Sequence, residues 1–131
     1  MLVDGGAQSV YAYLFAHPPD NPPHNPFVFH TAEIPFVFGT GPPFGVTANE
    51  TTLGQRMAAY WYSFANSTDG DPNPTTRDQT VWPKFTAEGD AVLRIDMESA
   101  GGIAVQHGLR KTACDWQTQQ SLARGGVPGL G

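Results

Sequence analysis

The sequence is short of charge, of cysteine and of long apolar runs, and each shortage excludes a class of protein. Only 15% of the residues are charged, against about 25% in a typical domain. The net charge of -5 argues against a nucleic-acid partner, whose phosphates need a basic face. A single cysteine excludes an internal disulfide framework. No stretch approaches about 18 apolar residues, so no membrane span is expected, and the N-terminal residues lack the pattern of a signal peptide.

Glycine and proline are abundant, with 15 and 12 copies among 131 residues. This is high for a compact domain but below the level typical of disorder. Few charges together with 11% aromatic residues indicate a surface that further protein would cover. The alternative is a small self-sufficient domain, which the length of the chain allows.

The first segment with a clear pattern is Val10 to Ala16, which is uncharged and rich in aromatic residues. Such a run predicts a strand covered on both faces, as in a parallel sheet. A parallel strand needs neighbours, and nothing upstream in this chain can supply them. The prolines between His17 and Pro26 then predict an irregular connection, and residues 39–46 form a second loop of this composition.

A helix is predicted to begin at the capping box formed by Thr47 and Glu50, in which each side chain satisfies a free N–H group. Apolar residues follow at helical spacing and make one stripe that packs into a core. They are Leu53, Met57, Tyr60, Trp61 and Phe64.

The C-terminal third predicts a turn, a short edge strand and a last helix. Asp69 to Pro74 has turn chemistry, Val92 to Ile95 forms the strand, and Leu109, Ala113 and Trp116 share one face of the helix. Residues 125–131 are expected to be a flexible tail. Glycosylation sequons at Asn49 and Asn66 are compatible with a secreted parent protein.

Six motifs occur in the order found in one family. The segment from Phe29 to Gly39 reads Phe-His-Thr-Ala-Glu-Ile-Pro-Phe-Val-Phe-Gly. With it occur the strand Val10–Ala16, Met57–Phe64, Gly70-Asp-Pro-Asn-Pro74, Trp82-Pro-Lys-Phe85 and Cys114-Asp-Trp116. Together they resemble the last quarter of the type B carboxylesterases and cholinesterases. The resemblance implies an α/β fold, with residues 1–124 as the C-terminal part of an α/β-hydrolase domain: one buried strand, the catalytic-histidine loop, an amphipathic helix, the edge strand and a terminal helix.

The resemblance implies that His30 is the general base and acid of a catalytic triad. Histidine suits this role because its unperturbed pKa lies near ambient pH. The family takes its triad acid from an earlier loop, so Glu33 is expected to fix the His30 loop instead. Thr31 stands where relatives usually carry glycine. The alternative for His30 is an ordinary polar histidine in an aromatic loop.

Other ionisable residues point to no further site. His17, His24 and His30 could be taken for a zinc set, but the prolines between them prevent a regular ligand face, and no metal or cofactor is expected. In some secreted relatives a cysteine at the place of Cys114 pairs with one well upstream. This chain has no such partner, so Cys114 is predicted to be a small buried hydrophobe on a helix.

The parts that would complete an esterase are missing from this chain. No Gly-x-Ser-x-Gly elbow precedes His30, and no His-Gly-Gly-Gly stretch offers oxyanion donors. The segment Met97–Gly102 resembles the family's elbow, but Met97 replaces its first glycine and Ser99 follows the histidine, so Ser99 is predicted to be a loop serine.

Two functions therefore remain. The first is the C-terminal part of a serine carboxylic-ester hydrolase, inactive alone, whose partners are the remainder of the domain and a small-molecule ester. The second is a non-catalytic, cholinesterase-like interaction or adhesion protein, or a truncated fragment without function. The retained His30 favours the enzyme.

Overall fold

The computed structural model describes residues 9–18, 27–40, 47–75 and 79–124. Its elements follow one another in the order β1 (Tyr13–Phe15), α1 (Ile34–Val37), α2 (Ala48–Asn66), β2 (Ala91–Ile95), the 3-10 helix η1 (Glu98–Ala100), β3 (Ala104–His107) and α3 (Lys111–Ala123). Most of the two proline-rich loops, His24 and the expected tail lie outside the described residues.

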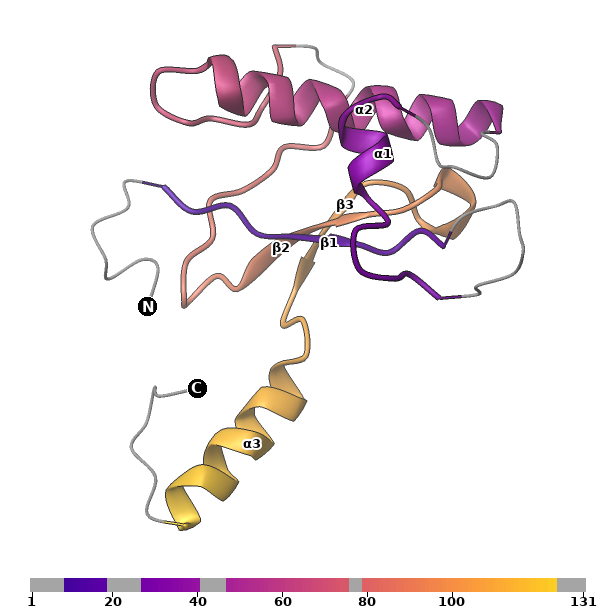
Figure 1. The fold of residues 1–131 in the computed structure, drawn as a ribbon. Helices are drawn as coiled ribbons and strands as arrows, with labels where there is room; N and C mark the ends of the chain where they lie inside the picture. Colours follow the sequence, from indigo (N-terminus) through magenta and orange to yellow (C-terminus); the bar gives the residue numbers. More distant parts are fainter. Residues whose placement is uncertain (1–8, 19–26, 41–46, 76–78, 125–131) are drawn as a thin grey trace.

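The three strands form one sheet in the order β1-β2-β3 (Figure 1). β1 runs parallel to β2, with Tyr13 beside Leu93, and β3 runs antiparallel to β2.

This sheet corrects two expectations from the sequence. The strand predicted from Val10 has a parallel neighbour downstream of it, because the intervening helices provide the crossover. The strand predicted at the edge, β2, lies in the middle, and β3 was not foreseen.

The long helix α2 is confirmed, together with its capping box at Thr47 and Glu50. It lies along one side of the sheet, and the short helix α1 crosses it (Figure 1). The two helices approach closely at Gly54, where an added Cβ atom would lie 3.4 Å from the carbonyl oxygen of Phe36. A glycine at this point lets the backbones of α1 and α2 approach, which brings α1 against the core.

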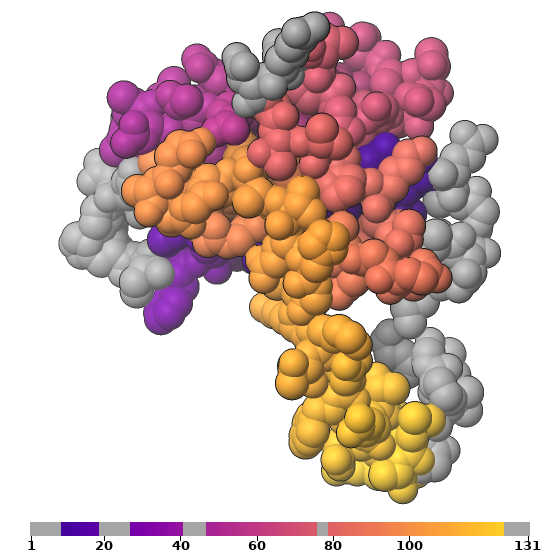
Figure 2. Space-filling model, turned by 180° about the vertical axis from the view of Figure 1, so that it is seen from behind, coloured from indigo at the N-terminus to yellow at the C-terminus, as the bar shows by residue number. Residues whose placement is uncertain are grey.

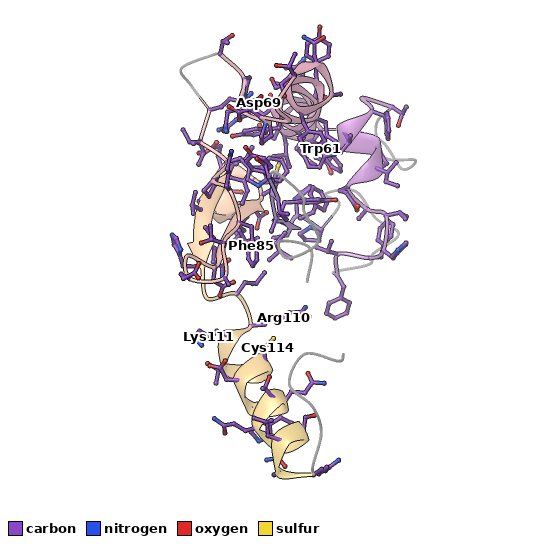
Figure 3. All side chains as sticks on the ribbon, turned by 90° about the vertical axis from the view of Figure 1, so that its left-hand side faces the viewer. Trp61, Asp69, Phe85, Arg110, Lys111 and Cys114 are labelled. Carbon is purple, nitrogen blue, oxygen red and sulfur yellow. The ribbon has the colours of Figure 1, made fainter. Side chains whose placement is uncertain are left out.

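The core includes residues of α2 and of the sheet, and an aromatic cluster around Trp82 forms part of it. The Trp82 ring packs edge-on against Tyr13 and Tyr60 and tilted against Trp61, with ring centroids 5.9, 5.7 and 5.3 Å away. Trp61, which is labelled in Figure 3, belongs to α2. The Trp82 indole also donates a 2.9 Å hydrogen bond to the carbonyl of Ala12. Aromatic pairs in these geometries contribute about 0.5–1.5 kcal/mol beyond their buried area.

The predicted stripe of α2 is buried only in part. Leu53, Met57 and Tyr60 are buried, but Phe64 is 51% exposed. The stripe therefore extends one turn beyond the core that the described residues form.

The last helix, α3, projects away from the rest of the molecule (Figures 1 and 2). All its residues are exposed, including Trp116 and Cys114, and Figure 3 shows Cys114 near its start, away from the core. The prediction of a buried Cys114 is wrong for this chain, because no described element packs on α3. Among the described helices, none has the length and apolar character needed to cross a membrane.

Candidate functional site

The His30 loop is a tight series of turns that leads into α1. The Ala32 N–H donates to the carbonyl of Phe29, and the Ile34 N–H donates to that of Thr31, both at 3.1 Å. Ala32 is buried beneath the loop, while His30 is exposed. The backbone is thus fixed by its own hydrogen bonds, and the imidazole has no hydrogen-bond partner among the described residues.

Thr31 has a left-handed backbone conformation, with φ of 74°. Its hydroxyl donates to the carbonyl oxygen of His30. A β-branched residue in this region is a steric outlier, whereas glycine reaches it without cost. This explains in physical terms why glycine suits the position after the histidine.

Glu33 lies at the start of α1 and is half-buried. Its carboxylate accepts a hydrogen bond from the Tyr13 hydroxyl of β1 at 3.4 Å. Burial and the neighbouring Glu33 carboxylate raise the pKa of Tyr13 above its usual value. Glu33 therefore links the His30 loop to the sheet, and no hydrogen bond joins its carboxylate to the imidazole of His30 among the described residues.

The segment that carries His30 also carries several exposed apolar side chains. Phe27 and Phe38, on either side of the loop, are 72% and 74% exposed. Three further apolar residues of this segment are also exposed, namely Val28, Phe29 and Ile34. We call these five residues the apolar collar. Exposed apolar surface gathered on one short segment typically marks an interaction or ligand site.

A second histidine, His17, has the opposite environment. It is buried, and its Nε2 lies 3.1 Å from an oxygen of the buried Glu50. Its Nδ1 lies 4.0 Å from the buried Asp96. Sequence reasoning considered His17 only as a zinc ligand and missed this cluster. Within the described part of the chain, no group of three metal-ligating side chains could hold a metal ion.

Ser99 lies in η1, between β2 and β3. Its residue is exposed, and it borders a pocket of about 140 Å³ together with Arg56 and Glu98, which form an ion pair. No histidine is among the described residues that line this pocket. The chain then turns back as an antiparallel strand, so the strand–turn–helix geometry of a nucleophile elbow is not formed here.

Comparison with known proteins gives a consistent assignment. Residues 2–117 match the carboxylesterase family. Over 118 residues the chain is 33% identical to human bile salt-activated lipase, covering 86% of this chain and 15% of that protein. It is 36% identical to the acetylcholinesterase of Gallus gallus over 114 residues, covering 84% of this chain and 14% of that enzyme.

The structure is similar to the solved structure of a PNB esterase, with a TM-score of 0.66 and 26% sequence identity. The match covers 82% of this chain and 21% of the esterase. The fold is that of part of an α/β-hydrolase, and the chain spans roughly a seventh to a fifth of the length of these relatives. The protein belongs to the carboxylesterase family.

Proposed function

We propose that this chain is the histidine-bearing part of a serine carboxylic-ester hydrolase. His30 is the general base that takes the proton of a nucleophilic serine and returns it to the leaving alcohol. The serine and the acid that orients His30 belong to a part of the hydrolase domain outside this chain. The observation that carries the proposal is an exposed imidazole on a backbone loop fixed by its own hydrogen bonds.

The position of His30 in the chain supports this role. In the α/β-hydrolase order the nucleophile comes first, then the acid, then the histidine. His30 follows β1, a strand in parallel pairing, and precedes α1. An imidazole that faces outward from a rigid turn can accept a proton on one nitrogen while an acid holds the other. Such a base contributes about 10²–10⁴-fold to the rate, which is small beside the whole effect of an esterase, about 10⁶-fold or more.

The apolar collar is a second observation that supports the proposal. Phe27 and Phe38, which flank the His30 loop in the sequence, are mostly exposed, and exposed apolar surface of this kind typically marks a place where further protein packs. The chain corresponds to only 15% of the human lipase that it resembles. The collar therefore faces the remainder of the hydrolase domain, which brings the serine to His30 and encloses the acyl or alcohol part of the ester.

Glu33 has a supporting role in this scheme. Its carboxylate is bonded to Tyr13 of β1, so it anchors the start of α1 to the sheet rather than orienting the imidazole. Replacement by glutamine keeps an acceptor for the Tyr13 hydroxyl. We expect Glu33→Gln to reduce turnover less than His30→Ala does.

The test uses the longer hydrolase that the proposal implies, with this chain as its histidine-bearing part. His30→Ala is expected to abolish turnover, with kcat lowered by at least about 10²–10⁴-fold, while the melting temperature changes little, because the backbone hydrogen bonds that fix the loop are kept. His107→Ala is the matched control, since His107 is also exposed and should leave kcat unchanged. An equal loss in both variants, or a residue other than serine at the upstream elbow, would refute the hydrolase and favour the interaction protein.

The isolated chain provides a second measurement. It should hydrolyse p-nitrophenyl acetate no faster than an equal concentration of free imidazole, because one general base has neither nucleophile nor oxyanion donors to work with. A rate many orders of magnitude higher, retained through purification and lost on heating, would contradict the proposal.

A further inference from the structure

We propose that the buried His17 is a positioning residue for the His30 loop. Its imidazole, held between the carboxylates of Glu50 and Asp96, fixes α1 in place and through α1 the turn that presents His30. A role of His17 in catalysis rests on the proposed function, whereas its effect on the stability of the His30 loop does not. The two are tested separately below.

Three residues distant in the sequence meet at this cluster. His17 follows β1, Glu50 lies in the first turn of α2, and Asp96 follows β2. Their exposed fractions are 3%, 1% and 4%. The imidazole Nε2 is 3.1 Å from Glu50 Oε1, and Nδ1 is 4.0 Å from Asp96 Oδ1. The cluster thus ties together the ends of two strands and the start of the long helix.

Both ring nitrogens of His17 face a carboxylate. The Nε2–Glu50 distance is that of a hydrogen bond, whereas Nδ1 and the Asp96 carboxylate are neighbours without a direct hydrogen bond. Buried carboxylates are costly unless they are paired. Asp96 also pairs with Arg94 and accepts from the Met97 N–H at 2.8 Å. The contact with the His17 ring is therefore one of the contacts that compensate for burial of the Glu50 carboxylate.

Glu50 has further contacts, which join the His17 cluster to the start of α2. Its second oxygen accepts from the N–H and the hydroxyl of Thr47, at 2.9 and 3.2 Å. The same carboxylate therefore caps α2 and holds His17. Because α2 carries Gly54, against which α1 packs, a shift at Glu50 moves the support of α1.

The ring of His17 also reaches α1 directly. It packs edge-on against Phe36, with centroids 5.7 Å apart and planes at 89°. Phe36 is the buried residue of α1, and its N–H donates to the carbonyl of Glu33 at 3.0 Å. From there the turn continues through the Ile34–Thr31 hydrogen bond to His30. One imidazole therefore supports the single buried anchor of the helix that follows His30.

Hydrogen exchange on the full 131-residue chain tests the first part. In His17→Gln, the amides of Ile34, Phe36 and Val37 should exchange about tenfold faster or more, as expected when local opening becomes easier. The amide of Leu93, which bonds to Ala12 in the sheet, should keep its protection. The control is His107→Gln, which replaces an exposed histidine bonded only to the carbonyl of Gly89 among the described residues and should change neither set.

A double variant separates positioning from simple packing. Glu50→Gln added to His17→Gln replaces the buried carboxylate that His17 contacted by a neutral amide, and this amide can pair with the amide introduced at position 17. Protection of the α1 amides should then recover at least in part. If His17 only filled space, the second substitution would not restore protection. Equal exchange of α1 in wild type and His17→Gln overturns the proposal. So does a global loss of protection in His17→Gln that the double variant leaves unrepaired.

The catalytic consequence is read in the longer protein. His17→Gln should lower kcat with little change in KM, and the double variant should regain part of kcat. If His30→Ala leaves turnover intact, the proposed function fails while the exchange result still decides the role of His17. If His30→Ala abolishes turnover and His17→Gln changes neither kcat nor exchange, only the positioning role is refuted.

Discussion

The hydroxyl of Thr31 donates a hydrogen bond to the carbonyl oxygen of His30, and Thr31 itself has φ of 74°. The bond is local and the backbone conformation is strained. The turn that presents the imidazole is therefore formed by a residue poorly suited to it. Strain of this kind typically costs about 1–3 kcal/mol and is found where the surrounding structure enforces it.

We expect Thr31→Gly to stabilise the chain by about 1 kcal/mol, because glycine adopts positive φ freely and the gain exceeds its extra entropy in the unfolded state. Denaturant unfolding measures the change. Thr52→Gly is the control, since Thr52 lies inside α2, where glycine is destabilising. Destabilisation by both substitutions would contradict the account of Thr31.

Asn73 fixes the backbone of Trp82 on both sides. Its side-chain oxygen accepts from the Trp82 N–H at 2.7 Å, and its amide donates to the Trp82 carbonyl at 3.1 Å. Asn73→Ala should lower the free energy of unfolding by about 2–3 kcal/mol, because both backbone groups of a buried residue lose their partner. The exposed Asn66 is the control, and Asn66→Ala should change the free energy of unfolding by no more than about 0.5 kcal/mol. An equal change in the free energy of unfolding for Asn73→Ala and Asn66→Ala would show that the two Asn73–Trp82 hydrogen bonds do not contribute to stability.

The sequence predicted those features that are encoded locally. The helix α2 is confirmed because its capping box and its helical spacing lie within one continuous stretch. The likeness to the carboxylesterases is confirmed because its motifs are short and ordered. The placement of His30 on a loop after a strand follows from the same motifs, whereas the helix α1 was not predicted and the catalytic role of His30 stays a prediction.

Features that depend on distant partners were missed. The strand β3 reads Ala-Val-Gln-His, a mixed tetrapeptide without a strand signal, and it forms because β2 offers it an edge. The pairing of His17 with Glu50 joins residues 33 positions apart, and no local pattern indicates it. Cys114 was expected to be buried, but burial requires a surface that the described chain does not provide.

Burial raises the pKa of Tyr60 above its usual value of 10.0, and the charge of Arg56 opposes this only in part. A raised folded-state pKa favours the neutral phenol, so this contribution to stability is complete below about pH 10 and is lost as the pH rises through the folded pKa. Tyr60→Phe should therefore flatten the fall of stability in alkaline solution, although it loses the hydrogen bond to the Thr80 carbonyl.

Chemical denaturation between about pH 8 and pH 11 measures this dependence. Burial also raises the pKa of Tyr11 and Tyr13, so part of the alkaline fall should persist in Tyr60→Phe. The control is Tyr62→Phe, because the Tyr62 side chain is 71% exposed. Identical alkaline profiles for wild type and Tyr60→Phe would show that Tyr60 does not cause the fall.

Ser99 should remain unlabelled by a fluorophosphonate probe, although its surroundings in the sequence resemble a nucleophile elbow. Met97, whose side chain is buried, takes the place of the glycine that lets an elbow turn sharply, and the Gly102 N–H closes the segment by bonding to the Met97 carbonyl at 2.9 Å. The chain then enters β3 rather than a helix, so the hydroxyl has neither the sharp strand-to-helix turn nor the adjacent base that activation requires. Mass spectrometry of the peptide containing Ser99 is the measurement, with Ser99→Ala as the control. Stoichiometric labelling that disappears in Ser99→Ala would instead identify a rearranged hydrolase with its nucleophile after its histidine.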